Sequence, residues 1–276
     1  MAQRCLLGVF AHPDDEVTMA GAFRRYHDDG VTTALICATR GEEGEISDPA
    51  LATHETLGQV REQELREASR IMGIEDLTFL DYHDGRLADA DPVEATGRIV
   101  RQIRRLRPQV IVTFDANGGY GHRDHMAIYR LTTSAFQQAG DPEAYPEQRS
   151  EGLEPFAPQK LYYIAFPRSM MEQLMGPVLR QQPDFQPFGT VATIPLQEMG
   201  TADERVTTVL PLDERLYAVR NAAMQAHRTQ QDPNGPFAHL TPEVLRSVWG
   251  TQYFVRAVPP AAPGDRSEDD LFAGVR

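Results

Sequence analysis

The first half of the chain alternates short apolar runs with amphipathic stretches, and this order limits its fold more than any other feature. The apolar runs predict strands over residues 6–10, 32–38, 77–80 and 110–114. The stretches after them predict helices over residues 17–29, 56–73, 93–107 and 123–139. A repeated strand-helix order favours a mostly parallel sheet with helices on both faces. We therefore expect a Rossmann-like α/β fold.

The second half is less regular and predicts a C-terminal extension that shapes the pocket. Further strands are predicted over residues 161–166, 190–196 and 249–258, and a helix over residues 213–230. Residues 140–159, rich in Pro, Glu and Gly, predict a loop insertion. We expect a single domain over residues 1–258. Residues 259–276 would form an acidic tail that is mobile or docks on a neighbouring subunit of a homo-oligomer.

Charge and cysteine content limit the partners and the compartment. The chain has 27 Lys and Arg against 40 Asp and Glu, a formal net charge of −13, which disfavours nucleic acid and anionic membranes. No apolar run approaches the ~18 residues of a membrane span, and no cleavable leader is visible, so a cytoplasmic protein is expected. Cys5 and Cys37 lie in strand-like runs and predict buried, reduced thiols.

The run Ala-His-Pro-Asp-Asp-Glu at residues 11–16 directly follows the first predicted strand. Crowding three carboxylates there costs several kcal/mol unless a positive group lies among them. A metal ion is the simplest candidate. Helix capping alone explains the run poorly, because a cap uses only one carboxylate.

A second cluster follows the predicted strand at 110–114 and has the sequence Gly-Gly-Tyr-Gly-His-Arg-Asp-His over residues 118–125. Ligands of such sheets bind at the carboxyl ends of strands, so both clusters would form one composite metal site. Catalytic zinc commonly takes three His or carboxylate ligands and leaves a place for water. His12, Asp15 and His125 fit that set. Iron or cobalt can also occupy such sites.

These paired motifs resemble the LmbE/PIG-L-type zinc-dependent N-deacetylases over residues 4–135. That family includes deacetylases of N-acetylglucosaminyl inositols and chitin-derived sugars, and amidases that act on mycothiol conjugates. Smaller similarities are the run Thr-Arg-Gly-Glu-Glu-Gly at 39–44, the Arg-x-x-Glu-Leu run at 61–65 and the Asp-Gly pair at 84–85. Arg123 stands where many members carry Pro, which changes the stiffness of the loop and adds a charge beside the site.

The resemblance implies a division of roles. It makes His12, Asp15 and His125 the zinc ligands. It makes Asp14 the general base and His122 the group that steadies the oxyanion. Zinc lowers the pKa of bound water toward ~7, a carboxylate can take its proton, and an imidazole can stabilise the developing negative charge. The leaving amine would then take a proton from Asp14 or His122.

Three further residues have two interpretations each. Tyr120 either donates a hydrogen bond to the oxyanion or packs on the rim of the site. Arg61 either contacts a sugar hydroxyl, which the family pattern slightly favours, or pairs with Glu64. Asp84 either accepts a hydrogen bond from a substrate hydroxyl or serves the turn at its own position.

Other residues are expected to support the site from behind. Asp124 would orient His12 or His122, because imidazoles that bind metals usually have such partners. His227, at the end of the predicted helix 213–230, would support the site or simply cap that helix. Glu16 is interpreted as a first-turn acid favoured by the helix dipole.

The sequence thus predicts zinc-dependent hydrolysis of an N-acyl group, most simply N-acetyl, from a glucosamine-containing small molecule. The nearest alternative is an amidase that cleaves thiol conjugates with the same machinery. A metal-free nucleotide-binding protein is disfavoured, because no Gly-x-Gly-x-x-Gly follows the first predicted strand. A non-catalytic scaffold is disfavoured by the intact set of acid, base and ligands.

Overall fold

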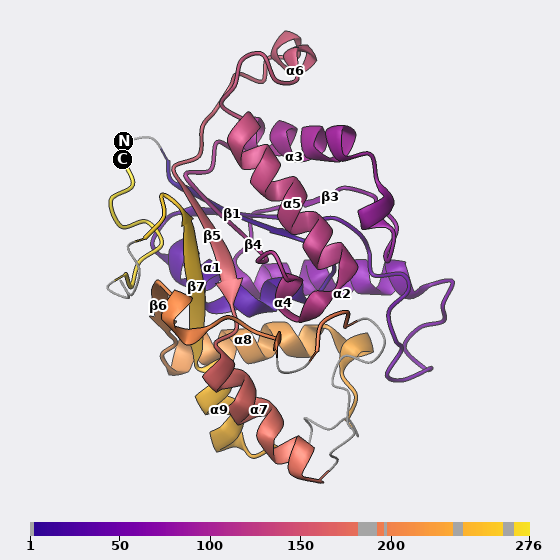
Figure 1. The fold of residues 1–276 in the computed structure, drawn as a ribbon. Coiled ribbons are helices and arrows are strands. Elements are labelled where there is room, and N and C mark those ends of the chain that lie inside the picture. The colour runs from indigo at the N-terminus through magenta and orange to yellow at the C-terminus, as the bar shows by residue number, and fades with distance from the viewer. Residues whose placement is uncertain (1–2, 182–191, 196–197, 234–239, 262–267) are drawn as a thin grey trace.

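A mixed seven-stranded sheet forms the centre of the molecule in the computed structural model, which describes residues 3–181, 192–195, 198–233, 240–261 and 268–276 (Figure 1). The strand order is β3-β2-β1-β4-β5-β7-β6. The strands are β1 (Cys5–Phe10), β2 (Thr32–Cys37), β3 (Asp76–Phe79), β4 (Val110–Thr113), β5 (Lys160–Ala165), β6 (Thr208–Pro211) and β7 (Thr251–Val258). Strands β1 to β5 pair in parallel, whereas β7 and β6 add in antiparallel pairs.

Helices cover both faces of this sheet. The helices α1 (Ala20–Asp28), α2 (Leu57–Met72) and α8 (Glu214–Ala226) contact one another on one face. The helices α3 (Pro92–Leu106) and α5 (Arg123–Gln138) contact each other on the opposite face (Figure 1). The predicted α/β fold is therefore confirmed.

Local signals explain where several helices begin and end. The carboxylate of Asp91 accepts hydrogen bonds from the backbone N–H groups at the start of α3, and Pro92 fits a first turn that needs no donor there. Gly73 ends α2 with a φ of 80°, a conformation in which glycine has no Cβ penalty.

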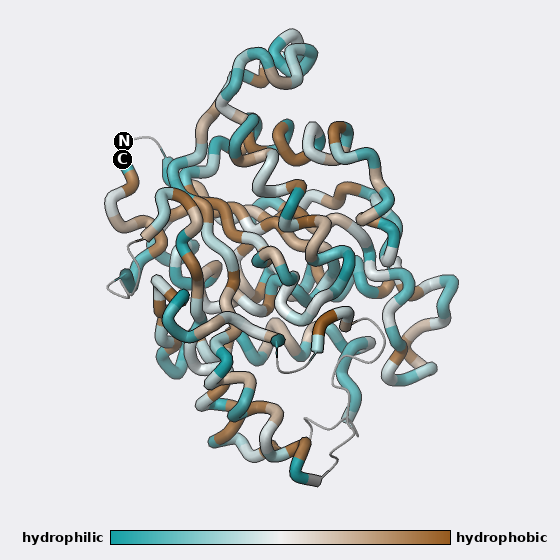
Figure 2. The backbone as a smooth tube through the Cα atoms, in the orientation of Figure 1, coloured by the Kyte–Doolittle hydropathy of each residue, from teal (hydrophilic) through white to brown (hydrophobic). Residues whose placement is uncertain are grey.

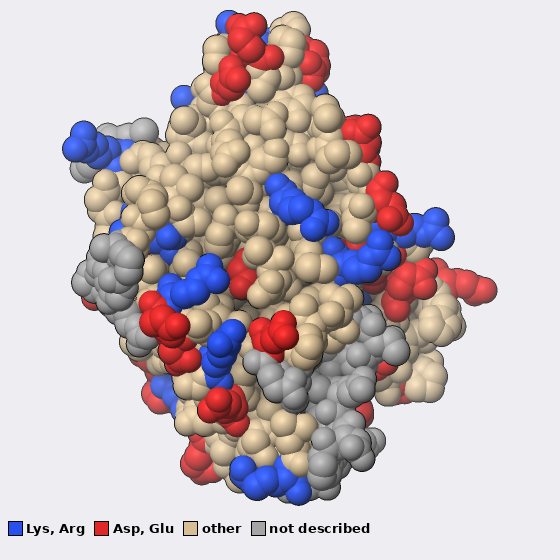
Figure 3. Space-filling model, in the orientation of Figure 1, with Lys and Arg blue, Asp and Glu red and all other residues tan. Residues whose placement is uncertain are grey.

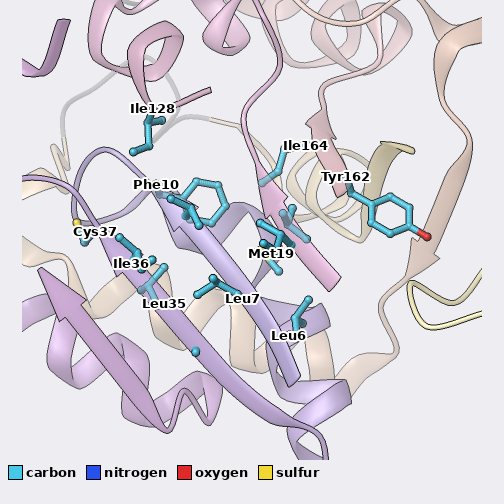
Figure 4. Packing of buried hydrophobic residues seen from close by; sticks show 14 of the residues in the cluster. Leu6, Leu7, Phe10, Met19, Leu35, Ile36, Cys37, Ile128, Tyr162 and Ile164 are labelled. Atoms are coloured by element: carbon cyan, nitrogen blue, oxygen red, sulfur yellow. The ribbon is translucent and has the colours of Figure 1, made fainter. Parts of the chain in front are cut away.

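The core lies along the parallel strands. All residues of β1 and β4 are buried, and hydrophobic segments, drawn in brown, run through the centre of the molecule (Figure 2). Figure 4 shows Leu6, Leu7 and Phe10 of β1 beside Leu35 and Ile36 of β2. Burying one such side chain contributes about 1.5–3 kcal/mol, so this double-sided burial fixes the sheet that carries the site. Both cysteines are free and buried, as expected.

Two predicted elements differ from the structure. The predicted helix at 17–29 begins as the 3-10 helix η1 (Asp15–Met19) before α1. The predicted strand at 190–196 is wrong for residues 192–195, which are irregular, and its other residues lie outside the described part of the chain. The edge of the sheet next to β7 is formed by β6, a short strand whose conformation depends on its pairing with β7. The final strand begins only after α9 (Pro242–Trp249).

The loop and the tail also gain structure. The short helix α6 (Pro146–Ser150) lies within the predicted loop insertion and projects from the body (Figure 1). Instead of a mobile tail, residues 268–276 pack against their own chain, with Leu271 and Phe272 buried. The side chain of Glu268 accepts hydrogen bonds from Lys160 and Tyr162 of β5. These contacts hold the end of the described chain against β5 and the edge strand β6.

The remaining elements shape the carboxyl edge of the sheet. They are η2 (Leu87–Asp89), α4 (Gly118–Gly121), α7 (Arg168–Gln181), η5 (Asp203–Arg205) and η6 (Arg228–Gln230). Helices α7 and α9 build a small core of their own from Met170, Leu174, Met175 and Val248. This core belongs to the C-terminal extension that was expected to shape the pocket.

Candidate active site

The two His/Asp clusters meet at the carboxyl edge of the sheet. Their strands, β1 and β4, are direct neighbours, and the strand order reverses between them, the position where open α/β sheets bind ligands. His12 follows β1 and His125 lies in the first turn of α5 after β4. Their facing nitrogens, His12 Nδ1 and His125 Nε2, are 3.1 Å apart. The predicted convergence of the two clusters is therefore confirmed.

Donor atoms of His12, Asp15 and His125 lie close together, and each imidazole is nearest to a different oxygen of Asp15. Asp15 Oδ1 lies 3.2 Å from His125 Nε2, and Asp15 Oδ2 lies 3.7 Å from His12 Nδ1. Tetrahedral coordination at about 2.0–2.1 Å places neighbouring ligand atoms roughly 3.3 Å apart. The spacings among these three residues are near that value. Among the described residues, single donor atoms lie within 4.8 Å of one another in two groups, His12 with His122 and His125, and His12 with Asp84 and Asp124.

Hydrogen bonds on the outer side hold both imidazoles in place. His12 Nε2 lies 2.9 Å from Asp84 Oδ1 and 3.4 Å from Asp124 Oδ2, while His125 Nδ1 lies 3.1 Å from the Gly118 carbonyl oxygen. Burial alone would lower the pKa of His12, but the hydrogen bonds to Asp124 and Asp84 raise it to about 10. Such partners orient imidazoles that bind metals. The expectation that Asp124 orients His12 is thus matched by a contact.

Asp84 lies elsewhere than expected. It does not face an open substrate cavity, because its two oxygens accept from His12 and from the Glu43 backbone N–H. Burial would raise the pKa of Asp84, but the contact with His12 lowers it to about 2. Asp84 therefore serves the imidazole of His12 instead of the predicted sugar hydroxyl.

Gly118 allows His125, in the second cluster, to lie close to His12. Gly118 has a φ of 58°, and a Cβ there would lie 2.6 Å from the Cβ of His125. Any side chain would therefore push His125 away from His12. This close approach explains the glycine at the start of the second motif.

The neighbouring acids Asp14 and Asp15 have different surroundings. The side chain of Asp15 is 8% exposed and faces the two imidazoles, whereas that of Asp14 is 29% exposed. Asp14 also has a φ of 100°, which is unusual for a residue other than glycine. Burial raises the pKa of Asp14 although Arg61 opposes the rise. Asp14 is thus the acid that remains accessible beside the donor atoms.

Arg61 holds the Asp14 loop instead of facing solvent. Its Nη2 donates to the Pro13 carbonyl oxygen at 2.6 Å and to Asp14 Oδ2 at 3.2 Å, and its Nη1 donates to the Gly41 carbonyl oxygen. The predicted contact of Arg61 with substrate would therefore need these bonds to change. The alternative pair with Glu64 is not formed either, because Glu64 accepts from the backbone N–H and the hydroxyl of Thr229.

A buried pair that the sequence did not reveal supports the same loop. Glu16 Oε2 accepts from the Asp14 backbone N–H at 2.9 Å, and Glu16 Oε1 lies 2.7 Å from His227 Nε2. Burial would lower the pKa of His227, but Glu16 raises it. His227 thus contacts the Asp14 loop through Glu16 and also lies at the C-cap of α8, so both interpretations of this residue agree with a contact in the structure. The sequence did contain a signal for this pair. Glu16 is the third acid in the run at residues 11–16, and a buried third carboxylate requires a positive partner of its own.

His122 and Tyr120 border the opening of the site. His122 is half-buried, its Nδ1 accepts from the Asp124 backbone N–H, and a neutral ring then carries its proton on Nε2. Burial, with His12 and His125 nearby, lowers the pKa of His122 to about 4. The Tyr120 ring lies edge-on to His125 at 5.2 Å. Both residues can supply hydrogen bonds beside the donor atoms.

Comparison with known proteins places this site in a family. The model of the PIG-L family, described as GlcNAc-PI de-N-acetylase, matches residues 7–136. Mycothiol S-conjugate amidase of Streptomyces coelicolor is 34% identical, over 98% of this chain and 97% of its own. This chain belongs to the PIG-L family. Another member, 1D-myo-inositol 2-acetamido-2-deoxy-alpha-D-glucopyranoside deacetylase of Thermobispora bispora, is 36% identical over 100% of both chains.

Solved structures of the same fold agree with this membership. N,N'-diacetylchitobiose deacetylase from Pyrococcus horikoshii superposes with a TM-score of 0.68 over 99% of this chain and 87% of its own, at 18% identity. The conserved protein TT1542 from Thermus thermophilus superposes with a TM-score of 0.62 at 26% identity, over 93% of this chain and 96% of its own. The PIG-L fold therefore extends through the second half of the chain.

The surface and the helices add two observations about partners. Lys and Arg are interspersed with Asp and Glu on the face shown in Figure 3, so this face carries no broad basic patch. Among the described helices, none is long and apolar enough to cross a membrane.

Proposed function

We propose that this PIG-L protein is a zinc-dependent deacetylase that hydrolyses the N-acetyl group of a glucosamine-containing small molecule. One observation carries the proposal: the nearest donor atoms of His12, Asp15 and His125 lie 3.1–3.7 Å apart, and the more exposed Asp14 directly precedes Asp15. The relatives with this domain are named as a glucosaminyl-inositol deacetylase and a conjugate amidase. Both names describe the hydrolysis of an amide.

In this proposal His12, Asp15 and His125 hold the zinc ion. When bound, the ion supplies Lewis acidity that polarises an amide carbonyl and lowers the pKa of water. Asp14 takes the proton of the attacking water, a task suited to a carboxylate whose pKa burial has raised. Arg61 and the Glu16 carboxylate keep Asp14 in its left-handed conformation, so the base is already oriented when substrate arrives.

The opposite side of the site would stabilise the negative charge that develops on the carbonyl oxygen. His122 donates its Nε2 proton to that oxygen, because its Nδ1 is already an acceptor. Tyr120 adds a second donor, since burial raises the pKa of its phenol and keeps it protonated. Asp14 then passes its proton to the leaving amine, which completes the hydrolysis.

The alternative substrate is a thiol conjugate of a glucosaminyl amide, as the name of the Streptomyces relative suggests. The same catalytic groups would cleave either amide, so only the groups around the acceptor site distinguish the two. A metal-free nucleotide-binding role is disfavoured by Asp14 and Asp15 at the start of η1, where a phosphate would meet negative charge.

A primary-amine release assay tests the proposal. The panel comprises N-acetylglucosamine, its oligomers, N-acetylglucosaminyl inositol and malate glycosides, and mercapturate-type conjugates. We expect amine release from an N-acetylglucosaminide, loss of activity with a chelator, and recovery when zinc is added. Turnover that survives exhaustive chelation, or failure on the entire panel by zinc-loaded protein, would refute the proposal.

A further inference from the structure

A buried carboxylate on α2 has no part in the proposed mechanism. Glu64 is 3% exposed and lies three residues after Arg61, so the two side chains leave the same face of the helix. Within the described ranges, both hydrogen bonds that Glu64 accepts come from Thr229. The Thr229 backbone N–H donates to Oε1 at 2.9 Å, and its hydroxyl donates to Oε2 at 2.7 Å. This contact joins the first half of the chain to the second.

The partner of Glu64 lies in the turn that follows His227. Thr229 is the middle residue of η6, and His227 is the N-cap of that turn. The Gln230 backbone N–H donates to the His227 carbonyl oxygen at 3.0 Å, and the Ser47 backbone N–H donates to the Thr229 carbonyl oxygen at 2.9 Å. The turn is therefore held by α2 on one side and by a loop on the other. Because Thr229 and His227 share this turn, a shift of one moves the other.

The contacts of His227 lead to one end of the peptide bond between Pro13 and Asp14. Glu16 lies 2.7 Å from His227 Nε2 and accepts from the Asp14 backbone N–H at 2.9 Å. Arg61 donates to the other end of the same peptide, the Pro13 carbonyl oxygen, at 2.6 Å. The C=O and N–H groups of a trans peptide point in opposite directions, so this peptide plane is held on two sides. Its orientation determines the φ of Asp14, which is 100°.

We propose that Glu64 and Thr229 are positioning residues for Asp14. The inference rests on the proposed function, in which Asp14 is the base. Helix α2 holds both ends of the peptide before Asp14, one directly through Arg61 and the other through the turn η6 and the residues that follow from it. A left-handed conformation of this kind persists only where its surroundings over-determine it. Without the contact between Glu64 and Thr229, the turn loses its bond to α2, and the carboxylate of Asp14 is less well oriented.

Thr229→Val tests this role, and Thr208→Val is its matched control. Both threonines are fully buried, and each donates its hydroxyl to a glutamate at 2.7 Å, but the partner of Thr208 is Glu268 in the tail. Urea denaturation should therefore show a similar loss of stability in both variants. We expect kcat for amine release to fall about tenfold in Thr229→Val alone, with unchanged KM and zinc content. Thr229→Ser, which keeps the hydroxyl, should recover most of kcat.

Hydrogen exchange gives a second readout that needs no turnover. Mass spectrometry of peptides that cover residues 11–18 should show faster amide exchange in Thr229→Val than in the unaltered protein, and no change in Thr208→Val or Thr229→Ser. If the zinc-loaded protein hydrolyses no substrate while this difference persists, the deacetylase proposal fails and the hold on the Asp14 loop stands. Equal exchange over residues 11–18 in Thr229→Val and Thr208→Val, or an unchanged kcat in Thr229→Val, would overturn the inference.

Discussion

Asp14 and Asp15 share a peptide bond but face in different directions, and the division of labour in the site depends on this. The left-handed conformation of Asp14 turns its carboxylate outward to Arg61, while Asp15 turns inward and accepts from the backbone N–H groups of Ala11 and His12. A conformation of this kind costs of order 1–3 kcal/mol, which the surrounding hydrogen bonds offset. Two identical side chains can therefore take the two different roles proposed for them, ligand for Asp15 and base for Asp14.

Asp14→Asn tests the role of the outward acid. An amide keeps the shape but cannot take a proton, so we expect kcat to fall by about 10²–10⁴-fold with unchanged zinc content. Stopped amine-release assays and elemental analysis of the same sample measure both quantities. Full turnover in this variant would assign the base to another residue, and loss of zinc would instead make Asp14 a ligand.

Asp84→Ala tests the hydrogen bond behind His12. Removing a carboxylate that orients a ligating imidazole typically costs 10–100-fold in metal affinity, so the affinity for zinc should fall by about that factor. Competition with a chromogenic chelator measures it. Asp89→Ala is the matched control, because that acid is exposed and its salt-bridge partner, at 3.7 Å, is Arg123. Equal affinities for zinc in the two variants would contradict this role and favour the earlier interpretation, in which Asp84 accepts a hydrogen bond from a substrate hydroxyl.

At this scale, the sequence predicted the residues whose positions follow from strand ends. His12, Asp15 and His125 come together because their motifs follow neighbouring parallel strands. The partners of Arg61 and Asp84 could not be predicted, since each reaches a loop 20 or more residues away. Glu16 lies in the first turn of η1, as predicted, but its contact with His227 was not predicted, because the two residues are 211 positions apart in sequence.

Among the elements, those with a strong periodic pattern were predicted and those defined by their neighbours were not. The four strands and four helices of the first half follow apolar periodicity, which their own residues determine. The edge strand β6 has only four residues, and its pairing with β7 decides its conformation. The packing of the tail was not predicted, because its acidic residues suggested exposure to solvent. In the structure Glu268 instead accepts hydrogen bonds from Lys160, Tyr162 and Thr208.

The docked tail predicts a stability that depends on pH. Burial would raise the pKa of the Glu268 carboxyl, but hydrogen bonds from Lys160, Thr208 and Tyr162 lower it. Glu268 therefore stabilises the folded state above the ordinary glutamate pKa of about 4.3, and this contribution is lost as the pH falls through the lowered value. Because Lys160 would be left buried without its partner, Glu268→Ala should reduce the free energy of unfolding by about 3 kcal/mol at pH 7.

Urea denaturation at pH 7 and at pH 3 measures this difference. Asp269→Ala, next to Glu268 but exposed, should leave the free energy of unfolding within about 0.5 kcal/mol of the original. The difference in the free energy of unfolding between the Glu268→Ala and Asp269→Ala variants should be smaller at pH 3 than at pH 7. An equal loss in both variants, or a gap that widens with acid, would mean that the tail does not hold the sheet.

At the scale of the whole molecule, the two halves contribute different parts of one site. The half that the family model matches supplies the donor atoms and the accessible acid. The second half supplies His227, at the end of α8, which contacts Glu16 behind the Asp14 loop. This arrangement suits a family whose members are named for different amide substrates, since the second half can vary while the first retains the chemistry.

The bond between Glu16 and His227 also bears on how the molecule is made. A ribosome delivers the chain from its amino end, and domains assemble in that direction. The sequence through His125 emerges about a hundred residues before His227. A nascent chain that has reached His125 thus contains all three residues proposed to hold zinc, while the loop bearing Asp14 still lacks its contact through Glu16 to His227. We therefore expect the proposed zinc site to form before the loop of the proposed base is fixed.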